Sequence, residues 1–104
     1  MGRTCWRSCS RLADAADEVY LDIDCDVFDP VLFPAVGQPV PFGLAPPVVL
    51  AVIDAVWSDR VRGVFLSEFV PARDRDDGCL ATLAWLIEHL LLRRYEGIAP
   101  PPLA

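Results

Sequence analysis

Hydrophobic and polar positions along the chain follow two patterns, one typical of strands and one typical of helices. Residues 19–24 and 61–69 are short runs rich in branched and aromatic residues, and they predict two strands. Residues 3–17, 46–57 and 78–95 have the length and spacing of helices. A strand followed by a helix and a second strand folds as a right-handed parallel crossover. We therefore expect an α/β fold.

The helix predicted over 46–57 is apolar on nearly every side. Asp54 is its only charged residue, and this pattern predicts burial against more than one neighbour. Two parallel strands also need cover on both faces and further strands beside them. The sequence therefore predicts the C-terminal fragment of a three-layer α/β/α parallel-sheet domain. A missing N-terminal half or homo-oligomerisation would complete it.

The chain divides into three parts by composition. Residues 1–18 predict an N-terminal helical segment, residues 19–96 a partial α/β domain, and residues 97–104 an extended proline-rich tail. Prolines and glycines crowd residues 28–47, which predicts an irregular loop between the first strand and the helix that follows it.

Composition excludes several classes of protein. The net charge is -6 and all nine basic residues are arginine, so the chain lacks the basic surface that binds nucleic acid. No apolar run is long enough to span a membrane. The four cysteines lack zinc-site spacing, and no export signal precedes them. We expect a cytoplasmic protein with reduced thiols.

Carboxylates gather where the predicted strands end. Alternation along an extended strand would place Asp22, Asp24 and Asp26 on one face. Carboxylates this close repel one another unless a cation neutralises them, and hard divalent ions suit oxygen ligands. Glu68 follows the second strand, so it should reach the same edge of the sheet. The simpler alternative is that these acids only face solvent and cap turns.

Two enzyme families have an apolar strand that ends in two aspartates separated by one residue, as at Asp24 and Asp26. The residues Asp24-Cys25-Asp26-Val27 resemble the motif of haloacid-dehalogenase-type phosphatases, the runner-up hypothesis. That resemblance implies a later lysine, and this chain has none.

The stronger resemblance is to the ureohydrolases, the family of arginase, agmatinase and formiminoglutamase. Their Asp-x-Asp-x-x-Asp-Pro pattern is matched by DCDVFDP at 24–30. Their following loop resembles PAVGQPVPFGL at 34–44, and their strand that ends in Glu resembles GVFLSEFVP at 63–71. The matches come in the same order and together are far more specific than one short motif. Asp22 departs from the family, where a small hydroxyl residue is usual.

The resemblance implies a hydrolase of linear C–N bonds in guanidino, amidino or formimino compounds, with a binuclear Mn²⁺ centre. Asp24 and Asp26 would be metal ligands, and Glu68 would bind the cationic group of the small-molecule substrate. Asp29 would form a turn. The family takes its histidine ligands from motifs that this chain lacks, and His89 lies on the predicted polar face of its helix. We therefore expect negligible activity from this chain alone. The alternative is a catalytically dead remnant or association module.

Overall fold

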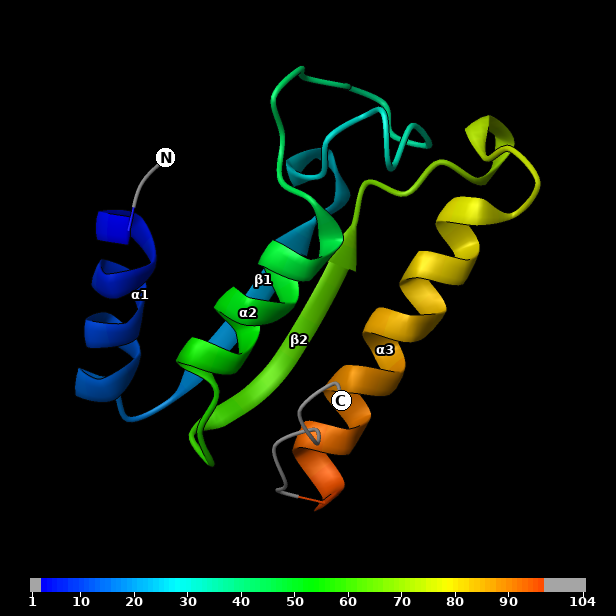
Figure 1. The fold of residues 1–104 in the computed structure, drawn as a ribbon. Coiled ribbons are helices and arrows are strands. Elements are labelled where there is room, and N and C mark those ends of the chain that lie inside the picture. Colours follow the sequence, from blue (N-terminus) through cyan, green and yellow to red (C-terminus); the bar gives the residue numbers. More distant parts are fainter. Residues whose placement is uncertain (1–2, 97–104) are drawn as a thin grey trace, which may run out of the picture.

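The computed structural model describes residues 3–96 and confirms the predicted order of elements (Figure 1). The tail predicted over 97–104 lies outside the described residues. The helices and strands are α1 (Arg3–Ala15), β1 (Val19–Asp24), α2 (Pro46–Val56), β2 (Val61–Ser67) and α3 (Gly78–Glu96). Short 3₁₀ helices follow each strand, at Cys25–Val27 and Pro71–Arg73. No helix in this described part is both long and apolar enough to cross a membrane.

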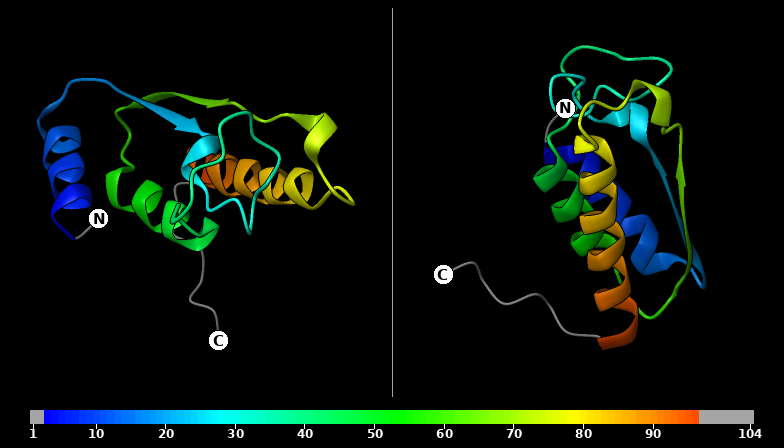
Figure 2. Two further views of the ribbon diagram at one scale, coloured as in Figure 1. Left: turned by 90° about the horizontal axis from the view of Figure 1, so that it is seen from above. Right: turned by 90° about the vertical axis from the view of Figure 1, so that its right-hand side faces the viewer.

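The two strands form a parallel pair that is covered on one face only. Leu21 pairs with Val64 and Ile23 with Leu66, and these side chains face the helices. All three helices lie on that same side of the sheet (Figure 2). The opposite face carries Tyr20, which is 58% exposed. Parallel sheets are normally buried on both faces, so these elements make up one face of a layered α/β structure.

The hydrophobic core lies between the sheet, the helices and the loop that follows β1. Phe28, Phe33 and Val36 from this loop are almost completely buried, and they join Ile53 of α2 and Leu86 of α3. The loop therefore has a fixed place in the core despite its prolines. This packing holds the loop against the C-terminal ends of both strands.

The prediction that α2 packs against more than one neighbour is confirmed, because α2 contacts both α1 and α3, but part of its apolar surface is open to solvent. Val49, Ile53 and Val56 are buried, whereas Val48 is 46% exposed. The same holds for α3, where Leu91 is 51% exposed. Both helices therefore carry apolar residues on a surface that no other element of the described chain covers.

The N-terminus of α3 is capped by an acidic side chain. Asp74 accepts hydrogen bonds from the backbone N–H groups of Cys79 at 2.8 Å and Leu80 at 3.0 Å. These are two of the donors that the first turn of a helix leaves unpaired. The bonds lower the pKa of Asp74 although partial burial opposes them.

Candidate metal and substrate site

The candidate site lies at the C-terminal ends of the two strands. Asp24 is the last residue of β1 and pairs in register with Ser67, the last residue of β2. Glu68 comes directly after β2, one residue beyond that pair. Both strands point to the end of the molecule where the loop after β1 and the segment after β2 gather (Figure 1). Open α/β sheets place their ligands at this end.

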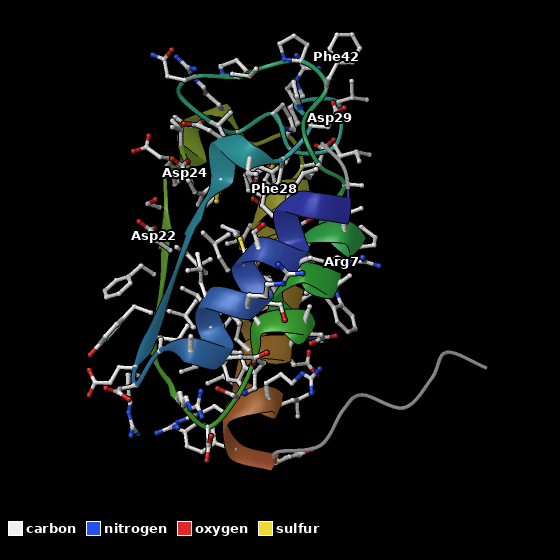
Figure 3. All side chains as sticks on the ribbon, turned by 90° about the vertical axis from the view of Figure 1, so that its left-hand side faces the viewer. Arg7, Asp22, Asp24, Phe28, Asp29 and Phe42 are labelled. Carbon is white, nitrogen blue, oxygen red and sulfur yellow. The ribbon has the colours of Figure 1, made fainter. Side chains whose placement is uncertain are left out.

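Alternation along β1 holds for two of the three aspartates. Asp22 and Asp24 are exposed on either side of the buried Ile23, and both lie on the side of the sheet away from the helices (Figure 3). The prediction that Asp26 shares this strand face is wrong, because the strand ends at Asp24. Oδ1 of Asp24 accepts a hydrogen bond from the backbone N–H of Asp26 at 2.9 Å, and this bond caps the 3₁₀ helix that follows.

Asp26 has an unusual side-chain environment. Its Oδ1 is buried and has no hydrogen-bond partner. A buried acceptor without a partner costs roughly 1–3 kcal/mol, more when it is charged, and such groups are rare in native proteins. A bound cation would supply the partner that this oxygen lacks.

A buried thiol lies between Asp24 and Asp26 in the sequence. Cys25 is completely buried, and its pKa is raised to about 11, first by burial and then by the charges of Asp24, Asp26, Cys79 and Glu68. The charges of all three carboxylates thus act on the same thiol. Within residues 3–96, however, no three histidine, cysteine, aspartate or glutamate side chains form a group that could hold a metal ion.

Glu68 is exposed in a conformation that few residues adopt. Its φ of 70° lies in the left-handed region, which costs a non-glycine residue roughly 1–2 kcal/mol. This conformation also ends β2 two residues earlier than predicted. The chain beyond it is held in place, because Val70 donates a backbone hydrogen bond to Ala35 at 2.8 Å and Phe69 forms a bridge with Val36.

The loop after β1 is tied to the site by backbone contacts. Asp29 accepts a hydrogen bond from the Val31 N–H at 2.9 Å, which agrees with the turn-forming role that the resemblance implied. The Asp29 N–H donates to Leu44 O at 2.9 Å, and the Leu44 N–H donates to Val27 O at 2.8 Å. Asp29 and Phe42 lie in this loop beyond the end of β1 (Figure 3).

Contacts between aromatic rings hold the loop after β1 against the segment after β2. The ring centroids of Phe28 and Phe33 lie 4.9 Å apart, and those of Phe33 and Phe69 lie 6.0 Å apart. Such contacts are favourable beyond the area they bury. Phe33 therefore links Phe28, in the motif that contains Asp26, to Phe69, in the segment that contains Glu68.

Its place on the predicted polar face of the helix indicated that His89 is solvated. This prediction is wrong, because His89 is mostly buried and contacts α2. Its Nε2 lies 2.7 Å from Oδ1 of Asp54, and the same oxygen accepts a hydrogen bond from Nε of Arg93 at 2.8 Å. This cluster joins α2 to α3 and takes no part in the candidate site. The sequence offered one signal for this cluster. Asp54 is the only charge in an apolar helix, and a histidine and an arginine lie four residues apart on α3.

Known proteins share this arrangement. A family model described as the arginase family matches residues 2–92. The chain belongs to the arginase family. This membership favours the ureohydrolase resemblance over the phosphatase one.

Relatives in the arginase family include two formimidoylglutamases. The protein from Cupriavidus pinatubonensis is 38% identical over 76 residues, which is 69% of this chain and 24% of that protein. The protein from Halobacterium salinarum is 34% identical over 80 residues, which is 75% of this chain and 26% of that protein. The chain thus spans about a quarter of the length of these curated relatives.

Solved structures of the arginase family show the same fold. The agmatine ureohydrolase of Thermoplasma volcanium has a TM-score of 0.75 at 29% identity, over 89% of this chain and 32% of that one. Helicobacter pylori arginase has a TM-score of 0.77 at 18% identity, over 88% of this chain and 32% of that one, a likeness of fold. The strand pair and its helices are therefore an α/β part of the arginase fold.

The described residues fit only part of a binuclear Mn²⁺ centre. Carboxylate oxygens suit Mn²⁺, and the unpaired Oδ1 of Asp26 is an available ligand atom. Asp24 keeps a second oxygen, because only its Oδ1 caps the 3₁₀ helix. Two carboxylates nevertheless leave two divalent ions short of ligands and of negative charge. The other ligands would have to come from outside the described residues.

Proposed function

We propose that this chain is the strand-pair portion of a metal-dependent hydrolase of linear C–N bonds. Its substrates would be formimino, guanidino or amidino compounds. The relatives named formimidoylglutamase favour the formimino class among these. The observation that carries the proposal is the buried, unpaired Oδ1 of Asp26 at the ligand-binding end of the sheet, in a chain of the arginase family.

The residues of this chain would have two separate tasks. Asp24 and Asp26 would supply carboxylate ligands to Mn²⁺, which when bound would provide a hydroxide nucleophile near neutral pH. Glu68 would pair with the cationic nitrogen group of the substrate, since a carboxylate accepts charge-assisted hydrogen bonds from amidinium and guanidinium groups. Its exposed side chain, just beyond the strand, supports this assignment.

The chain by itself would lack turnover. Two metal-ligating carboxylates are too few for the pair of ions, and the described residues place no histidine at this edge. Activity would require further ligands from outside the described residues. This is the physical basis for expecting weak metal binding and no turnover from the isolated chain.

Calorimetric titration with Mn²⁺ tests the assignment on the chain itself. The proposal predicts weak binding that Asp26→Asn removes, because the amide is neutral and holds a cation less tightly. Asp29→Asn is the matched control, since Asp29 faces its own turn and an amide oxygen can accept the same bond. Equal Mn²⁺ affinity of Asp26→Asn and the unmodified chain would contradict the assignment. Binding without any role for Asp26 would favour the inert remnant.

A further inference from the structure

The backbone of Glu68 is unusual for its place in the fold. Its φ is 70°, and three other non-glycine residues in the described chain also have a positive φ: Phe42, Asp76 and Asp77. Those three lie in turns, whereas Glu68 comes directly after β2 and lies in no turn. A glycine would adopt this conformation freely, so glutamate at this position keeps its carboxylate at the cost of a strained backbone. Such strain persists only where surrounding contacts impose it, and it is found mostly at functional sites.

The segment that follows this residue is held against the loop after β1. We call this segment, residues 69–73, the strap; it leads from β2 toward α3 (Figure 1). The Val70 N–H donates to Ala35 O at 2.8 Å, and Phe69 forms a bridge with Val36. Ala35 and Val36 are both completely buried. The strap is therefore fixed to a part of the loop that belongs to the hydrophobic core.

Arg73 fastens the far end of the strap. Its Nη1 donates to Val36 O at 2.8 Å and to Gly37 O at 3.4 Å. Val36 is buried, and buried carbonyl groups need a hydrogen-bond partner. A charged donor makes a stronger bond than a neutral one, so a guanidinium is well suited to this contact. The Arg73 N–H also donates to Val70 O at 3.0 Å, which joins the two ends of the strap.

Glu68 lies between two parts of the backbone that are both held in place. On one side, Ser67 pairs in register with Asp24 at the end of the sheet. On the other side, the strap is bound to the loop. With both ends fixed, the left-handed angle at Glu68 is the geometry that joins them, and it can relax when the strap leaves the loop. The contacts of the strap therefore offset the strain at Glu68.

We propose that Arg73 is a positioning residue for Glu68. By holding the strap on the loop, its guanidinium imposes the left-handed backbone at Glu68 and so sets where the Glu68 carboxylate lies beyond the end of β2. The task of this carboxylate toward a cationic substrate rests on the proposed function. The coupling of Arg73 to the backbone of Glu68 does not, because it uses contacts within the described chain alone.

Hydrogen exchange at the Val70 amide, followed by NMR, measures how firmly the strap is held. This N–H donates to Ala35 O, so it exchanges with solvent when the strap leaves the loop. Arg73→Ala should speed the exchange about tenfold, because its charged hydrogen bonds to the loop are lost. Arg73→Lys should recover part of the protection, since an ammonium group also donates to a carbonyl. Arg75→Ala is the matched control, because Arg75 is exposed and lies beyond the strap, and it should leave the rate unchanged.

Substitution of Glu68 tests the strain that the strap imposes. Glu68→Gly should slow the Val70 exchange about fivefold, because the closed strap then carries no strain. Added to Arg73→Ala, it should bring the exchange back to within about twofold of the unmodified chain. Glu68→Ala removes the carboxylate but keeps the strain, so its rate should stay near that of the unmodified chain. Ser67→Gly, at the neighbouring strand residue, should give no slowing.

Three results would each overturn the proposal. They are an unprotected Val70 amide in the unmodified chain, a Val70 rate that Arg73→Ala leaves unchanged, and a Glu68→Gly rate no slower than that of Glu68→Ala. None of these measurements involves Mn²⁺ or turnover, so such a failure would leave the test of the hydrolase proposal as it stands.

Discussion

Replacing Gly43 by alanine should unfold the loop that supports the candidate site. An added Cβ would lie 2.6 Å from both the Asp29 nitrogen and the Phe28 carbonyl carbon. These are backbone atoms, so no flexible side chain can move aside. The loop must shift, and the backbone hydrogen bonds that Asp29 and Leu44 make across it would lengthen or break.

The size of the effect follows from what is lost. Each backbone hydrogen bond contributes about 0.5–1.5 kcal/mol, and displacement of the buried Phe28 adds to the loss, so we expect destabilisation of about 2–3 kcal/mol. Urea unfolding followed by circular dichroism measures it.

The matched control for this prediction is Gly37→Ala in the same loop. A Cβ at Gly37 would meet nothing within 4 Å, so its free energy of unfolding should stay the same or rise by up to about 1 kcal/mol. If Gly43→Ala and Gly37→Ala unfold at the same urea concentration, the close backbone approach at Gly43 is not what holds this loop.

Three further predictions concern charge and reactivity. Partial burial raises the pKa of Asp54, but hydrogen bonds from α3 outweigh this, so its folded pKa lies below the ordinary value of 3.8. The stability that this group contributes should be present above that value and lost as the pH falls through the lower folded pKa. Melting temperatures measured across acidic pH should show this loss, and Asp54→Asn should remove it. Asp74→Ala should lower the melting temperature and Asp74→Asn should lower it less, because asparagine also caps helices. Mass spectrometry after thiol alkylation should show the exposed Cys9 modified before Cys25, whose raised pKa and full burial leave it to react only as the chain unfolds. Equal rates for these two thiols would contradict this environment.

Local patterns in the sequence were enough to place the elements. The strand over residues 19–24 was predicted with its observed bounds, since its branched and aromatic residues favour no other local structure. The helix after the loop begins at Pro46 because two prolines fit a first turn. The loop itself was expected to be irregular, yet its burial depends on Phe28 and Phe33 meeting side chains far along the chain, and local patterns do not contain such contacts.

The site was harder to predict for two physical reasons. Asp26 leaves the strand because the carboxylate of Asp24 bonds to its N–H, and a local side-chain bond of this kind overrides alternation. His89 meets Asp54 across 35 residues of sequence, so its environment depends on how two helices pack. Glu68 was expected at the same edge as Asp24, and the parallel register puts it one residue beyond the Asp24 and Ser67 pair.

The most direct measurement of the central claim is turnover by a chimera. The segment of the Cupriavidus pinatubonensis formimidoylglutamase that aligns with this chain would be replaced by the corresponding residues of this chain. With Mn²⁺ present, we predict formamide release from a formimino substrate, lost on Asp26→Asn and retained on Asp29→Asn. A folded chimera without turnover, or one in which Asp26→Asn is fully active, would contradict the assignment of this strand pair to the catalytic metal site.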